Sequence, residues 1–345
     1  MIAIVGAGIA GLTAALALAR RNVGCVVFER GDRIPDEGAG IQLSPNAAAE
    51  LLDLGVRLDD AIQVGQRELR RWQDDTVLTR TGLDRYPVPY FTMRRGALVA
   101  ALRQAPVRLD HRCTAVHEDG TIELAGGATE RFDAVIGADG LHSATRALFR
   151  AQPPRDSGFV AHRAVLPLAQ ASAFTAPDRV VVWLGPGRNC VAYPIGADRL
   201  NLVVVTPGDD PRSSFTGWNP AVRGLISLAA GFDRRTLYDR APLPAWHQGR
   251  VVLAGDAAHP MLPFIAQGAA QAIEDAVTLA GCLGGPDAFA RYHAARRDRV
   301  QRVFELSRAG SRVHLLPDGP EQRDRDRALA AASPGSHDWL YGHRA

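Results

Sequence analysis

Short apolar runs separated by a helix-forming stretch open the chain and recur later in it. Residues 2–5 and 25–28 predict buried strands, and residues 12–21 between them carry apolar side chains at helical spacing. Two further apolar runs, at 134–136 and 251–254, predict strands of the same kind. Because buried strands that alternate with helices are typical of a parallel sheet, this pattern predicts an α/β fold.

The stretch from 156 to 249 has a different pattern, with little helical periodicity. Its β-rich runs are separated by turn signals, and they lie at 159–166, 179–184, 190–194 and 200–205. We expect a mainly antiparallel sheet inserted into the α/β fold, which is a common way to wall off a pocket. A helix from Pro286 to about residue 309 should follow, and the composition of the last part of the chain predicts loose packing.

The α/β part begins with a dinucleotide-binding fingerprint. Gly6, Gly8 and Gly11 lie between a predicted strand and a predicted helix, and Glu29 ends the next strand eighteen residues after Gly11. Glycines at this spacing let a pyrophosphate approach the helix N-terminus, and the acid reaches a ribose hydroxyl. An acid at this position favours an unphosphorylated adenosine ribose, such as that of NAD or FAD.

Two more acids, Asp139 and Asp256, follow apolar strand-like runs. The carboxyl ends of parallel strands line the crevice in which open α/β sheets bind ligands. Gly268 then opens a helix-forming run, and a glycine there lets a flat or anionic group approach free N–H groups. Arg95, in the first turn of another predicted helix, is unfavourable for the helix dipole unless an anion compensates it.

Composition narrows the class of protein. The chain has 345 residues, 46% of them hydrophobic and 22% charged, and a formal net charge of +3, which is typical of a soluble globular protein. We expect neither nucleic acid nor a membrane as partner, because the sequence has no basic stripe with aromatics and no membrane-length apolar run. Met1 leads directly into a strand, which leaves no room for a cleavable signal. Four widely spaced cysteines argue against a metal site or disulfides and for a reducing cytoplasm.

Three acid-bearing motifs together resemble a known family. They are Gly6-x-Gly8-x-x-Gly11 with Glu29, Asp139-Gly140, and Gly255-Asp256. In this order and spacing they resemble the class-A flavoprotein monooxygenases, which are single-component FAD-dependent aromatic hydroxylases. The likeness is greatest to the salicylate, 3-hydroxybenzoate and 6-hydroxynicotinate hydroxylases, particularly over residues 38–46 and 263–275, and it extends to about residue 310. It implies a Rossmann-type FAD-binding fold with an inserted substrate sheet.

The resemblance also implies three parts of the chain and a set of FAD contacts. The FAD-binding domain would comprise residues 1–68, 92–155 and 250–285, the substrate sheet residues 69–91 and 156–249, and the C-terminal helix and tail residues 286–345. The contacts would come from Gly6, Gly8, Ala10, Gly11, Glu29, Arg30, Gln42, Arg95, Cys113, Asp139, Asp256, Gly268 and Ala269. Within this set Glu29 would bind the adenosine ribose and Asp256 the ribityl chain, while Gly268 would lie at the isoalloxazine edge.

In this family NADH or NADPH reduces the flavin, and O₂ then adds to give a C4a-hydroperoxide that hydroxylates an electron-rich ring. The resemblance therefore implies FAD as cofactor, NAD(P)H and O₂ as co-substrates, and a phenolic or heteroaromatic acid as substrate. We find only one dinucleotide-binding fingerprint in the sequence, as in the family, where the nicotinamide has no domain of its own. The oligomeric state stays open, with a homodimer as one candidate.

On the substrate side, relatives often have a His four residues before the Tyr of a Tyr-Pro pair and use both at the phenol. Tyr193 matches the Tyr, but Asn189 stands at the His position, and an amide cannot act as a base near neutral pH. Removal of a phenol proton would then fall to Tyr193, to another residue such as His162, or to water, or the substrate needs no such help. Gln267 matches a pocket-lining position of the family, which makes Tyr193, Gln267 and His162 the expected catalytic set.

Three other features have a structural interpretation beside a functional one. Arg163 could pair with a substrate carboxylate or be a charge on the sheet surface. His259 is interpreted as a hydrogen-bonding residue of its loop rather than a catalytic one, and the basic run at 291–302 as a solvated helix face.

Two further functions stay open at this point. Asn189 in place of the family's His leaves room for an epoxidase, a tailoring oxygenase or a reductase that acts on a non-phenolic substrate. A flavin-binding protein without turnover is the other alternative, against which the intact Glu29, Asp139 and Asp256 argue.

Overall fold

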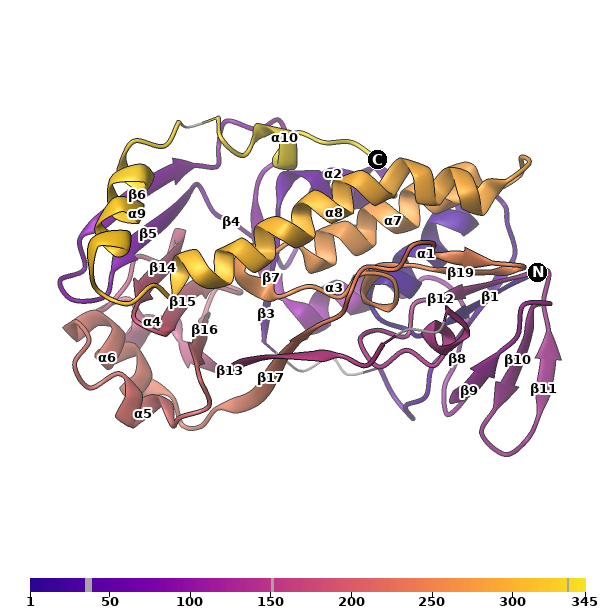
Figure 1. The fold of residues 1–345 in the computed structure, drawn as a ribbon, viewed down its shortest axis with the longest axis horizontal. Helices are drawn as coiled ribbons and strands as arrows, with labels where there is room; N and C mark the ends of the chain where they lie inside the picture. Colours follow the sequence, from indigo (N-terminus) through magenta and orange to yellow (C-terminus); the bar gives the residue numbers. More distant parts are fainter. Residues whose placement is uncertain (35–38, 150–151, 334) are drawn as a thin grey trace.

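The computed structural model describes residues 1–34, 39–149, 152–333 and 335–345, so Gly38 of the family-like segment 38–46 lies outside the described residues. Figure 1 shows an elongated molecule with the N-terminal α/β part at one end and the larger antiparallel sheet at the other. The long helix α8 runs across both parts, with α7 beside it. The fold is that expected from the sequence, a Rossmann-type domain joined to an antiparallel sheet.

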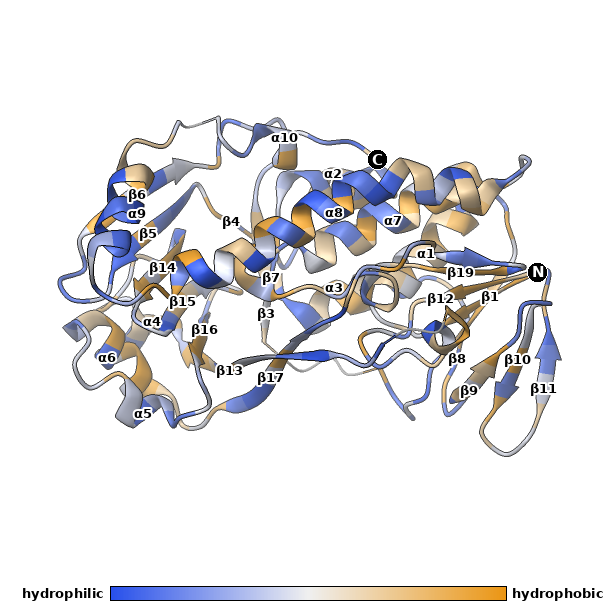
Figure 2. Cartoon of the chain, in the orientation of Figure 1, coloured by the Kyte–Doolittle hydropathy of each residue, from blue (hydrophilic) through white to orange (hydrophobic). Residues whose placement is uncertain are grey.

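The α/β part is built on a six-stranded sheet in the order β18-β19-β12-β1-β2-β8. Its strands are β1 (Ile2–Val5), β2 (Cys25–Phe28), β8 (Val107–Arg108), β12 (Ala134–Gly137), β18 (His247–Gln248) and β19 (Val251–Leu253). All neighbours pair in parallel except β18. Helices α1 (Ile9–Ala19), α3 (Arg95–Leu102) and α7 (Gly268–Cys282) contribute to the apolar core on one face. Figure 2 shows β1 and β12 as hydrophobic throughout, as strands buried on both faces should be.

The larger sheet has seven strands in the order β17-β13-β16-β15-β14-β5-β6. They are β5 (Gln66–Arg71), β6 (Val77–Gly82), β13 (Arg155–Pro167), β14 (Arg179–Gly185), β15 (Arg188–Pro194), β16 (Arg199–Thr206) and β17 (Asp233–Asp239). Every pair is antiparallel except β14 with β5. Helices α4 (Leu168–Ala171), α5 (Pro211–Ser214) and α6 (Pro220–Leu228) follow the sheet strands, and apolar residues of α4 and α6 share a core with one face of the sheet. The edge strand β17 was not expected from the sequence.

The fold also contains two small sheets and the helix α2. One sheet has the order β3-β7-β4, with β3 (Gly40–Leu43), β7 (Phe91–Arg94) and β4 (Ile62–Gln63), and the other joins β9 (Cys113–Val116), β10 (Thr121–Leu124) and β11 (Thr129–Arg131). Helix α2 (Pro45–Asp53) follows β3 and packs on α7. Short 3₁₀ turns lie at Thr145–Phe149, Gly255–Ala257 and Pro263–Ile265. The sheet strand β5 begins before residue 69, and β7 spans the expected limit at 91–92.

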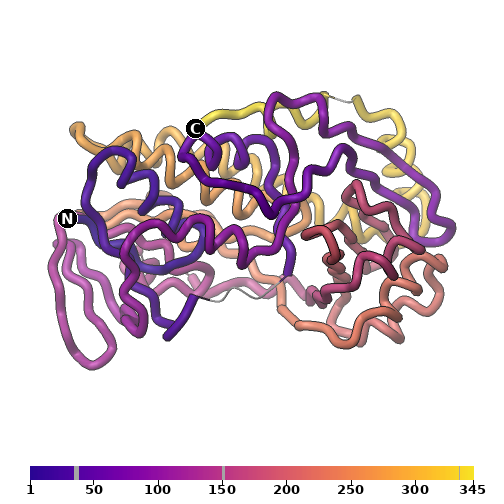
Figure 3. Tube along the Cα trace, turned by 180° about the vertical axis from the view of Figure 1, so that it is seen from behind, coloured from indigo at the N-terminus to yellow at the C-terminus, as the bar shows by residue number. Residues whose placement is uncertain are grey.

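The C-terminal region differs from the loosely packed tail expected from composition. After α8 (Ala288–His314), helix α9 (Pro320–Ala330) packs on β6, and α10 (Asp338–Tyr341) approaches α2. Arg71 donates to Asp326 at 3.1 Å, and Tyr341 is buried against Tyr86 and Tyr90. Figure 3 shows this yellow segment returning along the purple strands of the larger sheet. The expectation was wrong because a charged composition does not exclude burial when each charge finds a partner.

The basic run on α8 is also not simply a solvated face. Arg296 is 1% exposed, donates to Asp275 at 2.9 Å and forms an ion pair with Glu274, both on α7. Arg299 donates to the same Glu274 at 2.7 Å. These pairs join the two long helices. Among the residues that the structure describes, no helix combines the length and the apolar character needed to cross a membrane.

Candidate active site

A cavity of about 480 Å³ opens at the carboxyl ends of β1, β2 and β12, and we refer to it as the dinucleotide cavity. Seven of the residues expected at FAD line it, namely Gly6, Gly8, Glu29, Arg30, Arg95, Cys113 and Asp139. Burial, with a smaller contribution from the nearby Asp139, raises the pKa of the Cys113 thiol to about 12. Cys113 is therefore a neutral group there, so its side chain offers no charge to a ligand.

The three glycines of the fingerprint have different physical roles. Gly6 has φ +104°, and a Cβ on it would lie 2.5 Å from the Ala138 carbonyl oxygen. A Cβ on Gly11 would lie 1.9 Å from the Gly6 carbonyl oxygen, so this glycine lets α1 pack on β1 rather than lining the cavity. A Cβ on Gly8 would meet no atom of the described residues within 4 Å, and the free space belongs to the cavity. Ala10 is likewise not a lining residue, because it is buried against Gly255.

Both carboxylates of the dinucleotide cavity are held by backbone N–H groups. Glu29 accepts from Ala7 N at 2.9 Å and from Gly31 N at 3.0 Å, which fixes the glycine turn to the end of β2. Asp139 accepts from Ser143 Oγ at 2.5 Å and from Thr145 N at 3.1 Å. The acids at the two strand ends are thus oriented before any ligand binds.

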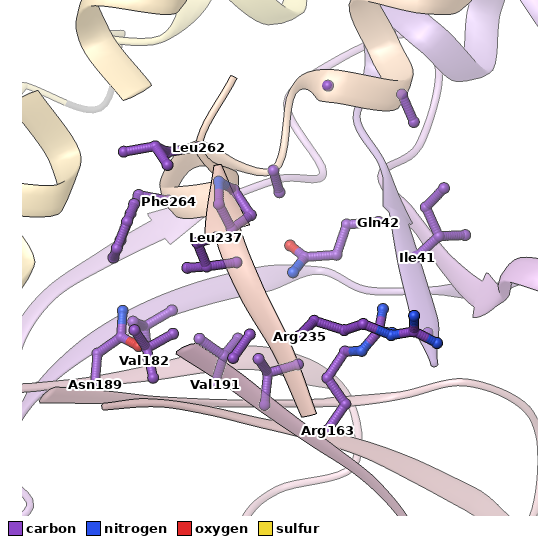
Figure 4. Close-up of a pocket in the computed structure, with 18 of the residues that line it drawn as sticks. Ile41, Gln42, Arg163, Val182, Asn189, Val191, Arg235, Leu237, Leu262 and Phe264 are labelled. Atoms are coloured by element: carbon purple, nitrogen blue, oxygen red, sulfur yellow. The ribbon is translucent and has the colours of Figure 1, made fainter. Parts of the chain in front are cut away.

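A second cavity, of about 370 Å³, lies between the inner face of the seven-stranded sheet, β3 and the loop that leads into α7. We refer to it as the ring cavity, and Figure 4 shows it in close-up. Its walls include apolar side chains of four sheet strands and of the loop, namely Val182, Val191, Val203, Val205, Leu237, Leu262 and Phe264. Gln42, Tyr193, Asp256, Gly268 and Ala269, all expected from the sequence, also line it.

Asp256 and the start of α7 form one wall of the ring cavity. The side chain of Asp256 is surrounded by protein but exposed to the ring cavity. A Cβ on Gly268 would lie 3.9 Å from Asp256 Oδ1. Burial within the protein raises the pKa of Asp256, and the charges of His259 and Arg95 partly offset this rise. No described side chain caps the N-terminus of α7, so its first N–H groups stay available to a ligand.

Arg95 stands in the first turn of α3, as expected, with its side chain in the dinucleotide cavity. Burial lowers its pKa, and the charge of Arg163 adds to this, whereas Asp256 acts in the opposite direction. A bound anion would stabilise the charged guanidinium of Arg95, so a phosphate is a suitable ligand for it.

The inner face of the seven-stranded sheet brings together side chains two residues apart on each strand. Asn189, Val191 and Tyr193 of β15 all line the ring cavity. Burial raises the pKa of the Tyr193 phenol well above its usual value, so the group is a neutral hydrogen-bond donor. Arg163 of β13 also faces the cavity and donates to Asp233 at 2.6 Å.

Two expected catalytic residues lie elsewhere. His162 is buried on β13 between the cavity-lining Ala161 and Arg163, and its Nε2 lies 3.2 Å from Thr206 Oγ1. Strand alternation puts its side chain on the opposite face of the sheet. Gln267 is 1% exposed and does not line the ring cavity, because its amide donates to Ser44 Oγ at 2.9 Å. These positions do not support catalytic roles for His162 and Gln267.

His259 belongs to a buried polar network behind the cavity, in line with the structural interpretation. Its Nε2 lies 2.5 Å from Asp275 Oδ2, which also accepts from Gly255 N at 2.9 Å. Burial alone would raise the pKa of Asp275, but His259 and Arg296 outweigh it and hold the pKa far below its usual value. The network fixes the loop that carries Asp256 to helix α7.

Two residues that line the ring cavity, Arg235 and His314, were not predicted from the sequence. Arg235 comes from β17, which was not predicted, although the alternation of Arg235 and Leu237 with their neighbours is that of a half-buried strand. His314 is the last residue of α8 and reaches the ring cavity only through tertiary packing.

The side chains and backbone groups of the two cavities fit the chemical groups of FAD. The dinucleotide cavity offers an open glycine turn, the N-terminus of α1 with its free N–H groups and an arginine for the diphosphate, and a carboxylate at the end of β2. The ring cavity offers a mostly apolar space beside the N-terminus of α7. The residues present therefore fit this cofactor.

Comparisons with known proteins agree with this geometry. Residues 4–56 match the NAD(P)-binding Rossmann-like domain family, and residues 238–307 match the FAD binding domain family. The chain is 40% identical over 380 residues to a 3-amino-4-hydroxybenzoate 2-monooxygenase of Streptomyces platensis, covering 100% of this chain and 96% of that protein. It is 35% identical to the 6-hydroxynicotinate 3-monooxygenase of Pseudomonas fluorescens, covering 89% and 90%.

Among solved structures, HpxO of Klebsiella pneumoniae, determined with FAD and uric acid, superposes with a TM-score of 0.87 at 26% identity, covering 99% of this chain and 95% of that one. The two monooxygenases, which are 40% and 35% identical to this chain over most of its length, confirm the resemblance drawn from the three acid-bearing motifs. They also favour the monooxygenase over the reductase and the inactive flavin-binding protein. The chain belongs to the FAD-dependent aromatic monooxygenases.

Proposed function

We propose that this enzyme uses NADH or NADPH and O₂ to hydroxylate a small aromatic acid that carries a hydroxyl or amino group. The observation that carries the proposal is the ring cavity, which is mostly apolar and has Arg163 and Arg235 on one side (Figure 4). The start of α7 also lines it. Its volume of about 370 Å³ is that of a site for a small organic molecule. The activities by which the relatives are named, on 3-amino-4-hydroxybenzoate and 6-hydroxynicotinate, support the same class of substrate.

Bound FAD would supply the redox and oxygen chemistry. The protein would bind and orient the cofactor and the substrate and shield them from water. Gly6, Gly8 and Arg95 would hold the diphosphate, and Asp256 the hydroxyls of the chain between diphosphate and ring. The first N–H groups of α7 would favour negative charge on the ring edge next to Gly268. The apolar side chains of the sheet would exclude water from the reacting ring.

The function is tested by a screen of aromatic acids against the purified FAD-loaded enzyme. We expect at least one hydroxybenzoate or aminohydroxybenzoate to accelerate NADH or NADPH oxidation and to yield about one hydroxylated product for each nicotinamide consumed. If every acid leaves the oxidation rate at its basal level, the proposed substrate class is wrong.

Arg163 should bind the carboxylate of the substrate. Its Nε has no partner among the described residues, and its Nη2 is held by Asp233. Changing Arg163→Met should raise the KM for an aromatic acid about 10- to 100-fold, the value of one charged hydrogen bond, and leave the affinity for the corresponding phenol unchanged. Arg199→Met, on the same sheet with 56% of its side chain exposed, is the control. If the substitution weakens the binding of the acid and of the phenol by the same factor, Arg163 does not bind the carboxylate.

Tyr193 should act as a hydrogen-bond donor in the ring cavity and not as a base, because burial raises the pKa of its phenol and keeps it protonated. Changing Tyr193→Phe should leave FAD bound and lower kcat/KM for hydroxylation about tenfold, the effect of one neutral hydrogen bond. FAD content from the visible spectrum and product analysis together check this. A variant that hydroxylates at the wild-type rate would rule the role out.

We further propose that the enzyme works in a reducing compartment, the cytoplasm. The four cysteines are all free in the structure, and Cys190 is completely buried as a small apolar side chain.

A further inference from the structure

A buried tyrosine that the proposed function does not use lies behind one wall of the ring cavity. Tyr90 is 1% exposed, and its hydroxyl donates to Gln42 Oε1 at 2.8 Å. Because Gln42 of β3 pairs with Thr92 of β7, and Tyr90 directly precedes β7, the two side chains start from neighbouring strands. Gly40 N at the start of β3 donates to Asn201 Oδ1 at 2.7 Å, which joins β3 to β16 of the larger sheet.

The burial of Tyr90 determines which way round the amide of Gln42 is held. Burial raises the pKa of the Tyr90 phenol well above its usual value, so the hydroxyl keeps its proton and remains a donor. If the amide were turned over, its NH₂ group would face Tyr90, and the buried hydroxyl would lose the acceptor that it has now. Since a buried donor without an acceptor is unfavourable, Tyr90 keeps the oxygen of the amide toward itself.

The NH₂ group of Gln42 is consequently the part of the amide that a ligand meets. Gln42 is half-buried and lines the ring cavity, and Figure 4 shows its side chain extending from β3 into that cavity. An amide NH₂ group carries two N–H donors. Burial raises the pKa of the Tyr193 phenol and hydrogen bonding from Gln42 acts in the opposite direction, so one donor serves Tyr193. The second donor is left for a ligand.

We propose that Tyr90 is a positioning residue, which acts through Gln42 to hold an N–H donor toward a hydrogen-bond acceptor of the ligand in the ring cavity. Two ligands bring acceptors there, namely the flavin ring with its carbonyl oxygens and the aromatic acid with its carboxylate or ring oxygen. A donor that is oriented before the ligand arrives loses less side-chain entropy on binding. For the acid this role rests on the proposed function, whereas FAD binding can be measured by itself.

A double-mutant cycle with two kinds of ligand tests this role. The wild type, Tyr90→Phe, Gln42→Leu and the double variant are titrated with FAD as FAD-free proteins, followed by flavin fluorescence. The FAD-loaded proteins are titrated with 3-amino-4-hydroxybenzoate and 6-hydroxynicotinate, followed by the visible flavin spectrum. For FAD or for an acid, we expect Gln42→Leu to raise the Kd about tenfold, the effect of one neutral hydrogen bond, and Tyr90→Phe to raise it about threefold or more. The double variant should match Gln42→Leu within about twofold, because Tyr90 acts only through Gln42.

Tyr86→Phe is the matched control for Tyr90→Phe. Both tyrosines pack edge-on against Tyr341, but the hydroxyl of Tyr86 donates to Asp338 at 2.9 Å rather than to a residue of the ring cavity. The control should therefore leave every Kd within about twofold of the wild-type value, even where it lowers the stability of the protein.

Each outcome of the cycle decides a different point. A higher Kd for FAD identifies the flavin as the ligand that Gln42 contacts, and a higher Kd for an acid identifies the substrate. The positioning role is wrong if Tyr90→Phe behaves like Tyr86→Phe, or if the effects of Tyr90→Phe and Gln42→Leu multiply in the double variant. If neither acid binds the wild type, the proposed function fails, and the FAD titrations alone decide the role of Tyr90. If Gln42→Leu does not fold, Gln42→Met takes its place.

Discussion

Asp256→Ala is expected to weaken FAD binding about 100-fold while leaving the stability of the FAD-free protein unchanged. The carboxyl faces the ring cavity, and between described residues it takes part in no hydrogen bond or ion pair. Its removal therefore costs the fold little, whereas bound FAD would lose two hydrogen bonds to a charged acceptor. Fluorescence titration of the FAD-free protein gives the Kd, and thermal unfolding without FAD gives the stability.

Asp139→Ala is the informative comparison for Asp256→Ala. Asp139 accepts hydrogen bonds from Ser143 and Thr145 inside the protein, so its loss should lower the Tm of the FAD-free protein as well as the affinity for FAD. If Asp256→Ala destabilises the FAD-free protein as much as Asp139→Ala does, Asp256 is a structural residue, and the cofactor assignment at the end of β19 is wrong.

Arg296→Met is expected to cost about 3–5 kcal/mol of the free energy of unfolding, the usual effect of leaving buried charges without a partner. Arg296 is fully buried between Glu274 and Asp275 and donates to both. Removing its charge leaves two carboxylates on adjacent positions of α7 with less compensation. Urea unfolding of the FAD-loaded protein, at a constant excess of FAD, measures the change.

Arg297→Met provides the matched control on the same helix. Its side chain is 60% exposed and pairs with the neighbouring Asp298, which is 83% exposed. Such a surface pair contributes little, so the control should stay within about 0.5 kcal/mol of the wild type. Equal effects of the two substitutions would mean that the buried network does not join α7 and α8 as described.

The acids at the strand ends and the glycine turn could be located from the sequence because each is a local feature. Each of Glu29, Asp139 and Asp256 follows closely on a short apolar strand, and parallel strands bring their carboxyl ends to one crevice. One glycine of the fingerprint, Gly11, does not line the dinucleotide cavity. Gly11 serves the contact between helix and strand, which spacing alone does not distinguish from a phosphate contact.

The substrate half could be predicted only in outline. Tyr193 was expected and lines the cavity, but His162 lies on the other face of the sheet, because one residue of register reverses a strand side chain. Arg235 and His314 reach the cavity through an edge strand and a helix end that are brought there by packing. The buried Arg296 shows the same limit, since a basic helix is interpreted as solvated until its acidic partners on α7 are known.

Isotope labelling of the product tests whether the enzyme inserts an oxygen atom from O₂ into an aromatic acid. The enzyme is incubated with ¹⁸O₂, NADH or NADPH and the aromatic acid that most stimulates nicotinamide oxidation, and the product is analysed by mass spectrometry. We expect a hydroxylated ring that carries one ¹⁸O atom, formed in about equal amount to the nicotinamide oxidised. Nicotinamide oxidation that yields only hydrogen peroxide, or a product whose new oxygen comes from water, would contradict it.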